Sequence, residues 1–367
     1  MLLNRLLKNL FLIHIMLFIF LGIVALFPIS IFIFGKLISA PRYKGLVSDH
    51  FDGKNFFNPW GKDPSGFKEA TKWMTDSKRD KKPWSEVKDF TLGEKPIESV
   101  SDGNLRVTFI GHSTVLIQMD GVNILTDPVW YSRASPFQFM GPKRVRPAGI
   151  KMEDLPPIHL ILLSHNHWDH LDIINLPKIY AQHKPLIITS LGVSQFLKQK
   201  GIHNSVDMDW WDEYSFKKEA TEFKITCLPT QHFSGRGLFD RNGTLWSGFM
   251  ISSPTSGNVY FAGDSGYAPF FKTIREKFGK IRLALIPIGA YLPAWFMSPI
   301  HCAPSEAVDI HIDVKAENSL AIHHNTFPLS DEGQYQPIED LNIALAEKGI
   351  SRDTFFVLEE GKMRDIV

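Results

Sequence analysis

The sequence predicts an α/β (α+β) protein in which two β-sheets face each other and helices cover their outer faces. Three observations support this prediction. Short apolar segments with strand character follow one another in residues 105–128 and again in residues 223–264. Strand-like and helix-like segments then alternate towards the C-terminus, which is typical of stacked layers. The chain has 367 residues, 44% of them hydrophobic, so it can bury a large core.

The first half of this pattern contains strands separated by turn residues. Residues 105–111 (LRVTFIG), 114–121 (TVLIQMDG) and 122–128 (VNILTDP) predict three short strands with Gly or Asp-Gly turns. Residues 159–165 (HLILLSH) are almost continuously apolar, which favours a buried strand. A strand over residues 186–190 is followed by a helix over 191–201 that Gly201 closes.

The second half predicts a further set of strands and then helices between them. We expect strands over residues 223–232, 244–253, 258–264, 283–289, 319–324 and 354–360, and helices over residues 268–279, 303–312 and 338–349.

The N-terminus predicts a membrane anchor. Residues 10–34 contain no Asp, Glu, Lys or Arg, and a bilayer-spanning helix needs about 20 apolar residues. The run exceeds the roughly 7–15 apolar residues of a secretory signal. We therefore expect an uncleaved transmembrane helix over residues 1–35 and a single-pass membrane localisation, with the side of the membrane left undetermined. We also expect a polar arm over residues 36–100 that packs on a catalytic domain over residues 101–367.

Charge and cysteine content exclude several classes of protein. Lys and Arg number 40 and Asp and Glu number 39, for a net charge of +1, so a nucleic-acid partner is not expected. The two cysteines, Cys227 and Cys302, are too few for a disulfide framework or a cysteine zinc site.

Metal-binding side chains gather in the segment SHNHWDHLD. His165 and His167 lie two residues apart at the end of a predicted strand, so both can reach one cation. Asp169 and His170 follow on the turn and can reach a second cation nearby. Neutral imidazole and carboxylate groups suit zinc and similar divalent ions. The alternative is a polar loop with satisfied histidines.

Three more candidate ligands end predicted strands further along the chain, namely His232, Asp264 and His323. The order H-x-H-x-D-H, then a histidine, an aspartate after glycine and a last histidine, resembles the metallo-β-lactamase-fold hydrolases over residues 105–365. The resemblance implies a four-layered αββα sandwich and two divalent metal ions, expected to be Zn²⁺. It also implies the ligands: His165, His167 and His232 for one ion, Asp169, His170 and His323 for the other, and Asp264 as the bridge.

A narrower resemblance concerns the segments FIGHSTVLIQMDGVNILTDPVW, PTQHFSGRGLFDRNGTLWSGF and AIHHNTFPLSDE. They are similar to the N-acyl-phosphatidylethanolamine-hydrolysing phospholipase D group. That group usually has Trp-Gly after the last metal histidine, whereas this chain has His324 and Asn325. Two adjacent histidines therefore compete for the ligand role, and we choose His323 because Thr326 and Phe327 then keep the spacing of the group.

The expected activity is metal-dependent hydrolysis with Asp169 and Asp264 in the catalytic centre. Two ions that share a water lower its pKa, so a bridging hydroxide is available to attack phosphorus or a carbonyl carbon. We favour a phospholipase D-type phosphodiesterase acting on N-acyl-phosphatidylethanolamine or a related phospholipid, with a membrane as partner. The alternative is a lactonase, thioesterase or β-lactamase-type hydrolase, because the same hydroxide serves either reaction. A nuclease or a non-catalytic module is less favoured, given the near-zero charge and the intact ligand set.

Five further residues are candidates for substrate contact or for support of the ligands. His112 is either structural or a neighbour of the ligands, and Asp127 either supports a ligand histidine or caps a turn. Arg236 could pair with a lipid phosphate. The resemblance places His301 beside the substrate, with a role at the start of a helix as the alternative, and His324 could replace or assist its neighbour.

Overall fold

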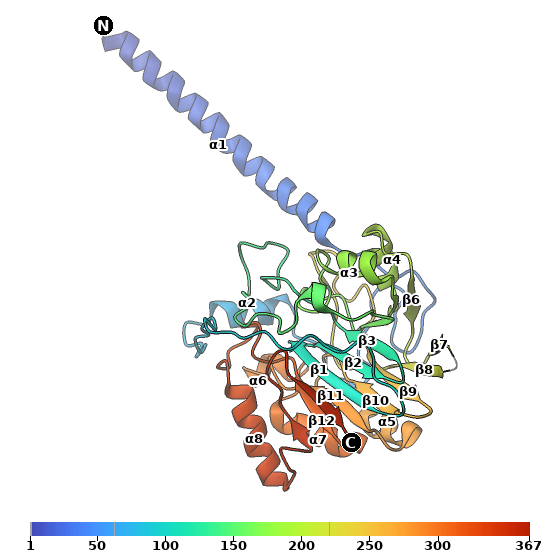
Figure 1. Cartoon of the computed structure of the whole chain (residues 1–367). Helices are drawn as coiled ribbons and strands as arrows, with labels where there is room; N and C mark the ends of the chain where they lie inside the picture. The colour runs from blue at the N-terminus through green and yellow to red at the C-terminus, as the bar shows by residue number, and fades with distance from the viewer. Residues whose placement is uncertain (1, 62, 220) are drawn as a thin grey trace.

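Two sheets of seven strands lie face to face in the computed structural model, which describes residues 2–61, 63–219 and 221–367 (Figure 1). The first sheet has the order β14 (Met363–Ile366), β1 (Leu105–Gly111), β2 (Thr114–Met119), β3 (Val122–Thr126), β4 (Leu160–Leu163), β5 (Leu186–Ser190) and β6 (Ser205–Met208). Pairing is antiparallel from β14 to β3 and parallel from β3 to β6.

The second sheet repeats this arrangement. Its order is β13 (Phe355–Phe356), β12 (Ser319–Ile322), β11 (Leu283–Pro287), β10 (Gly257–Phe261), β9 (Gly248–Ser253), β8 (Thr221–Leu228) and β7 (Glu213–Lys218). Pairing is parallel from β13 to β10 and antiparallel from β10 to β7. Each sheet therefore joins a parallel half to an antiparallel half.

The alternation of side chains along each strand builds the layers. In β4, Leu160 and Leu162 point into the core between the sheets, whereas Ile161 and Leu163 point to the outer face. Helices α3 (Leu176–His183) and α4 (Val193–Gln199) cover that outer face.

The same division holds on the other side of the molecule. Helices α5 (Phe270–Phe278), α7 (Pro304–Val314) and α8 (Gln336–Lys348) cover the outer face of the second sheet (Figure 1). The predicted αββα sandwich is confirmed, and every strand and helix expected within residues 105–360 is present, most of them with shifted ends. Elements that the sequence did not predict are α2 (Phe67–Thr75), α3, the 3₁₀ turn Met152–Asp154, α6 (Ala294–Met297), β6, β7 and β14.

The segment between α1 and β1 contributes to the interior of the sandwich. Phe51 and Phe56 are 1% exposed and pack in the core between the sheets. The Trp73 indole donates a hydrogen bond to the Asp331 carboxylate at 2.8 Å, and the Trp84 indole donates to a backbone carbonyl of the same loop. This segment therefore packs against the sandwich through aromatic side chains.

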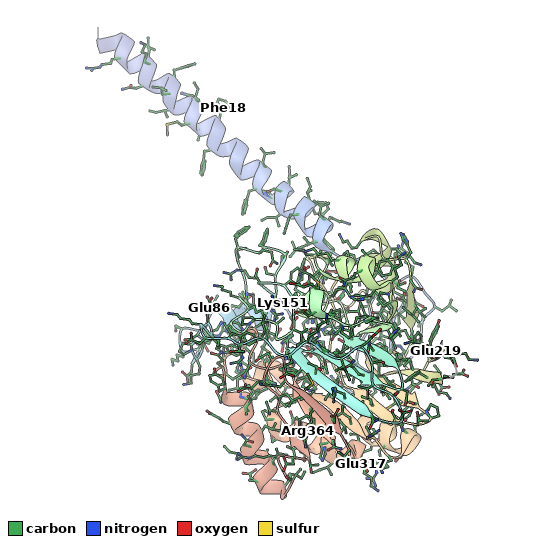
Figure 2. The ribbon with its side chains drawn as sticks, viewed as in Figure 1. Phe18, Glu86, Lys151, Glu219, Glu317 and Arg364 are labelled. Atoms are coloured by element: carbon green, nitrogen blue, oxygen red, sulfur yellow. The ribbon has the colours of Figure 1, made fainter. Side chains whose placement is uncertain are left out.

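The N-terminal helix α1 (Leu2–Ile38) extends away from the sandwich (Figure 1). Phe18 lies far from the body and is 73% exposed (Figure 2), and only the last turns contact the domain, where Phe34 stacks on Phe137 with ring centroids 4.7 Å apart. Within the described ranges, no helix is both long and apolar enough to cross a bilayer. The predicted transmembrane helix over residues 1–35 and the single-pass membrane localisation are therefore wrong.

Candidate metal centre

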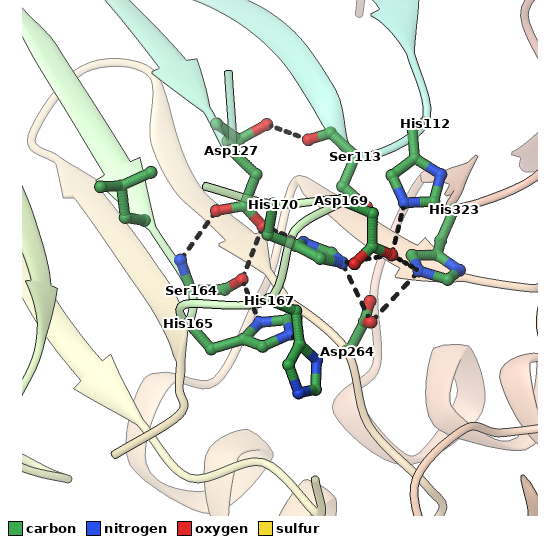
Figure 3. Close-up of polar contacts among 12 residues, drawn as sticks. His112, Ser113, Asp127, Ser164, His165, His167, Asp169, His170, Asp264 and His323 are labelled. Carbon is green, nitrogen blue, oxygen red and sulfur yellow. Dashed lines mark hydrogen bonds and ion pairs between the residues drawn. The ribbon is translucent and has the colours of Figure 1, made fainter. Parts of the chain in front are cut away.

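Strand ends from both sheets meet at one rim of the sandwich, and the predicted ligands lie on them (Figure 3). His165 comes two residues after the end of β4, and Asp264 comes three residues after the end of β10. His323 follows β12 immediately, and His232 follows β8. Because these strands run in the same direction within their sheets, their ends present side chains to the same region.

Three imidazoles form the first donor group. Nε2 of His165 is 2.8 Å from Nδ1 of His167, and Nε2 of His232 is 3.2 Å from the same atom. All three offer a ligand atom within 4.8 Å of one another. The structure thus brings together the three residues predicted for the first ion.

The second donor group contains one carboxylate and three imidazoles, from His112, Asp169, His170 and His323. Oδ2 of Asp169 accepts a hydrogen bond from Nε2 of His112 at 3.1 Å and lies 3.4 Å from Nε2 of both His170 and His323. Asp169, His170 and His323 are the residues predicted for the second ion. His112 joins them as a fourth member.

Asp264 lies between the two groups. Its Oδ2 is 3.0 Å from Nε2 of His170, 3.2 Å from Nε2 of His323 and 3.8 Å from Nε2 of His232. One carboxylate therefore faces imidazoles of both donor groups, which is the placement required of a bridging ligand. Figure 3 shows its contacts with His170 and His323.

Hydrogen bonds from behind orient the ligand rings. The Asp127 carboxylate contacts Nδ1 of His170 at 2.6 Å and accepts from the hydroxyl of Ser164, also at 2.6 Å. That hydroxyl is 2.9 Å from Nδ1 of His165, and Nδ1 of His232 is 2.8 Å from a backbone carbonyl. With Nδ1 engaged, Nε2 of each ring is left for a cation.

The backbone is strained at three positions of the site. His112, Asp127 and His323 have φ of 57°, 30° and 59°, in the left-handed region that residues other than glycine rarely adopt. Such strain persists only where surrounding structure enforces it, and it concentrates at functional sites.

Burial and charge set the protonation of the centre. Burial lowers the pKa of His165 well below its usual value, so this imidazole is neutral at pH 7. Burial also opposes charge on His170, but the Asp264 and Asp169 carboxylates outweigh it and raise the His170 pKa well above its usual value. The same carboxylates raise the pKa of His323 to about 9 against the effect of burial. The buried carboxylates of Asp169 and Asp264 therefore favour positive charge beside them, from a protonated histidine or from a cation.

The donor set fits divalent cations. Imidazole nitrogen and carboxylate oxygen are ordinary ligands of zinc and other transition metals. Oδ1 of Asp264 is buried and has no hydrogen-bond partner among the described residues. A buried carboxylate oxygen without a partner is costly, and a bound cation would remove that cost.

Three further candidates lie in different surroundings. His301 faces the centre, with Nδ1 3.9 Å from Oδ2 of Asp264. His324 points away from it: its ring stacks on Phe109, with centroids 5.3 Å apart, and burial lowers its pKa to about 4. Arg236 is 5% exposed, and its guanidinium donates to backbone carbonyls behind the metal-ligand segment.

Two residues of the site were not predicted from the sequence. Ser164 links Asp127 to His165 through its hydroxyl, and its position between a strand and the first ligand was the only available signal. Phe233 packs edge-to-face on His167, with ring centroids 4.4 Å apart. It also belongs to an apolar cluster with Trp73 and Phe296, which links α2 and α6 to the rim.

Comparison with known proteins agrees with this geometry. The profile described as "Beta-lactamase superfamily domain" matches residues 122–324. N-acyl-phosphatidylethanolamine-hydrolyzing phospholipase D 1 of Caenorhabditis elegans is 41% identical over 266 residues, covering 70% of this chain and 74% of the relative. The mitochondrial N-acyl-phosphatidylethanolamine-hydrolyzing phospholipase D of Saccharomyces cerevisiae is 36% identical over 257 residues, covering 70% of this chain and 54% of the relative. Among solved structures, the metallo hydrolase Igni18 of Ignicoccus hospitalis aligns with a TM-score of 0.55 and 21% identity over 71% of this chain and 98% of its own, a likeness of fold alone.

Proposed function

Because the chain belongs to the β-lactamase superfamily and is a metallo-hydrolase of that fold, we propose that it is a phospholipase D-type phosphodiesterase that hydrolyses N-acyl-phosphatidylethanolamine or a related phospholipid. The identity of 41% with a relative named for this activity is the observation that carries the proposal. The yeast relative of the same name supports it. A phospholipid is presented in a lipid surface, which is the partner in this proposal.

We propose Zn²⁺ as the metal, in two sites. His165, His167 and His232 would hold one ion, and Asp169, His170 and His323 would hold the other, with Asp264 between them; their mutual distances support this division. Bound ions of this kind lower the pKa of water and stabilise negative charge on a phosphoryl oxygen.

The protein's own residues would position the reaction. Asp169 keeps 13% of its side chain exposed, so its carboxylate can meet a substrate as well as a cation. The His301 imidazole lies beside the Asp264 carboxylate, with Nδ1 3.9 Å from Oδ2, which supports a role next to the substrate. In the reaction, water adds to phosphorus, the bond from phosphorus to the ethanolamine oxygen breaks, and that oxygen takes a proton.

Apolar side chains beside the first donor group favour a substrate with hydrocarbon chains. Phe233 lies against His167 and joins Trp73, Phe296 and Met297 in one cluster. Trp295 next to it is 50% exposed. This wall supports a lipid because burial of hydrocarbon chains against aromatic and aliphatic groups is favourable.

The test is product analysis with purified, metal-loaded protein. N-acyl-phosphatidylethanolamine in mixed micelles should yield N-acylethanolamine and phosphatidic acid, the products of cleavage between phosphorus and the ethanolamine oxygen. Asp264→Ala should abolish the yield, whereas Asp365→Ala, which removes an exposed carboxylate on β14, should keep it. Turnover of a lactone, thioester or β-lactam without any N-acylethanolamine would reject the proposal in favour of another hydrolase of this fold.

A further inference from the structure

A loop between β8 and β9, residues 234–240, contacts residues 166–171, which carry three of the proposed ligands. We call the loop the linking loop and residues 166–171 the ligand segment. Within it, Nη1 of Arg236 donates to the carbonyls of Asn166 at 2.7 Å and Leu171 at 3.0 Å. The guanidinium also stacks over the Trp168 ring, 3.8 Å from its centroid. Arg236 thus contacts the start, middle and end of residues 166–171.

The ligand segment contacts the linking loop in return. The Trp168 indole donates to the carbonyl of Arg236 at 2.9 Å, and the side-chain oxygen of Asn166 accepts from the backbone N–H of Gly235 at 2.8 Å. Asn166 and Trp168 alternate with His167 and Asp169 along the chain. Fixing the first pair therefore fixes the peptide planes that aim the second pair.

The Arg236 guanidinium is charged and buried, so it needs hydrogen-bond partners. Arg236 is 5% exposed, and burial lowers its pKa to about 10, so it is charged at neutral pH. A buried cation is costly unless hydrogen bonds compensate it, and hydrogen bonds from a charged donor are about twice as strong as neutral ones. Two carbonyls of the ligand segment supply part of that compensation through Nη1, and the Asp240 and Asp172 carboxylates add favourable charge, so the segment and the guanidinium hold each other in place.

Asp240 ties the linking loop to the end of helix α1. Its carboxylate is fully buried and accepts from the backbone N–H groups of Arg236 at 3.0 Å, Gly237 at 2.8 Å and Ala40 at 2.8 Å. A Cβ added to Gly237 would lie 2.9 Å from the backbone oxygen of Gly35. The linking loop therefore packs closely on the last turn of α1, and its Asp240 side chain binds the chain that leaves α1.

From these contacts we propose that the linking loop is a positioning element for the metal centre: Arg236 holds the ligand segment in its metal-binding conformation, and Asp240 makes that conformation depend on the chain that leaves α1. Arg236 is 5% exposed and Asp240 is fully buried, so neither is assigned a contact with the substrate. The proposal rests on the metal centre alone and is independent of the substrate class proposed above.

Hydrogen–deuterium exchange of the metal-free, full-length protein tests the positioning role directly. Amides of residues 166–171 should exchange faster in Arg236→Met and in Asp240→Asn than in the wild type, whereas amides of β2 should not change. Arg106→Met is the matched control, since it removes an arginine that pairs with Asp365 at the opposite edge of the sheet. Unchanged exchange in the ligand segment of both variants would overturn the proposal.

Metal binding gives the second readout. Zn²⁺ affinity, measured by competition with a chelator, should fall about 10- to 100-fold in Arg236→Met, the range found when a residue that orients metal ligands is lost. The visible absorption of the Co²⁺-loaded protein should change with it. Arg236→Lys should recover part of the affinity, because an ammonium still donates to the carbonyls. If Arg236→Met kept the Zn²⁺ affinity and the Co²⁺ spectrum of the wild type, Arg236 would have no role in positioning the metal ligands.

The double variant tests whether the two residues act together. If they form one positioning element, Arg236→Met combined with Asp240→Asn should weaken Zn²⁺ binding little more than the worse single variant. Additive losses would mean two unrelated contacts and would overturn the dependence on α1. Because neither measurement uses a lipid, failure of the phospholipase assay would leave this test intact.

Discussion

The Asp127 carboxylate accepts a hydrogen bond from Nδ1 of His170 at 2.6 Å, and both side chains are completely buried. This contact fixes the tautomer of His170, so that its Nε2 faces Asp264 at 3.0 Å. One carboxylate outside the donor groups thereby determines which atom of a proposed ligand is offered to a cation.

Asp127→Asn should weaken metal binding by about 10- to 100-fold, because a single amide oxygen cannot accept both from the backbone N–H of Ser164 and from Nδ1 of His170, which now bind different carboxylate oxygens. Chelator competition measures the effect. Asp309→Asn, an exposed carboxylate paired with Lys348, is the control and should bind metal as the wild type does. Equal affinity in Asp127→Asn would contradict the orienting role.

Asp264→Ala and His165→Ala should each lose bound metal and hydrolytic activity together, since each removes a donor that faces others within 4.8 Å. Elemental analysis and a turnover assay on the same sample test this. Loss of activity with two metals per chain retained would refute the proposed ligand assignment.

The adjacent histidines should behave differently. His323→Ala should lose metal, because its Nε2 lies 3.2 Å from Asp264. His324→Ala should keep metal but unfold more easily, by about 2 kcal/mol, because it leaves a cavity beside Phe109. Metal content and urea unfolding measure the two effects, and metal loss in His324→Ala alone would reverse the assignment.

A histidine far from the centre should make stability depend on pH. His50 is 5% exposed and lies between Asp209 at 2.7 Å and Asp49 at 2.6 Å, with Trp210 stacked on its ring. Burial opposes its charge, but the two carboxylates raise its pKa above 6.5.

A raised pKa contributes stability that is fully present below the unfolded-state value and is lost as pH rises through the folded-state value. His50→Gln should therefore lower the melting temperature more at pH 5.5 than at pH 9. An equal loss at both pH values would exclude titration of this residue as the cause.

Much of the fold followed from apolar patterning because the central strands are buried on both faces. β3, β4, β11 and β12 are buried along their whole length, and continuous apolar runs identify such strands. The edge strand β7 was missed because its residues alternate between exposed and partly buried and carry charge. β14 was missed because its sequence, MRDI, carries two charged residues and only Ile366 in it is buried.

The proposed ligands could be predicted because each follows a recognisable strand. The role of Arg236 could not, since its partners are backbone carbonyls of a distant segment, and no side-chain pattern encodes those. His323 was preferred over His324 only from its spacing to Thr326 and Phe327, because the strand alternation alone could not decide between adjacent residues; in the structure the His323 ring faces Asp264 and the His324 ring stacks on Phe109. The charge-free run at the N-terminus predicted a membrane span that the described helices do not support.

The packing of β4 on both of its faces links the correct register of this strand to metal binding. Leu160 and Leu162 face one layer, Ile161 and Leu163 face the other, and the first ligand of the centre comes two residues later. A strand that slipped by one position would exchange its two apolar sets and carry His165 out of reach of its partners. A chain that folded with β4 in the wrong register would therefore be unable to retain its metal ions. The metal content of a preparation can serve as a measure of the fraction of correctly folded protein.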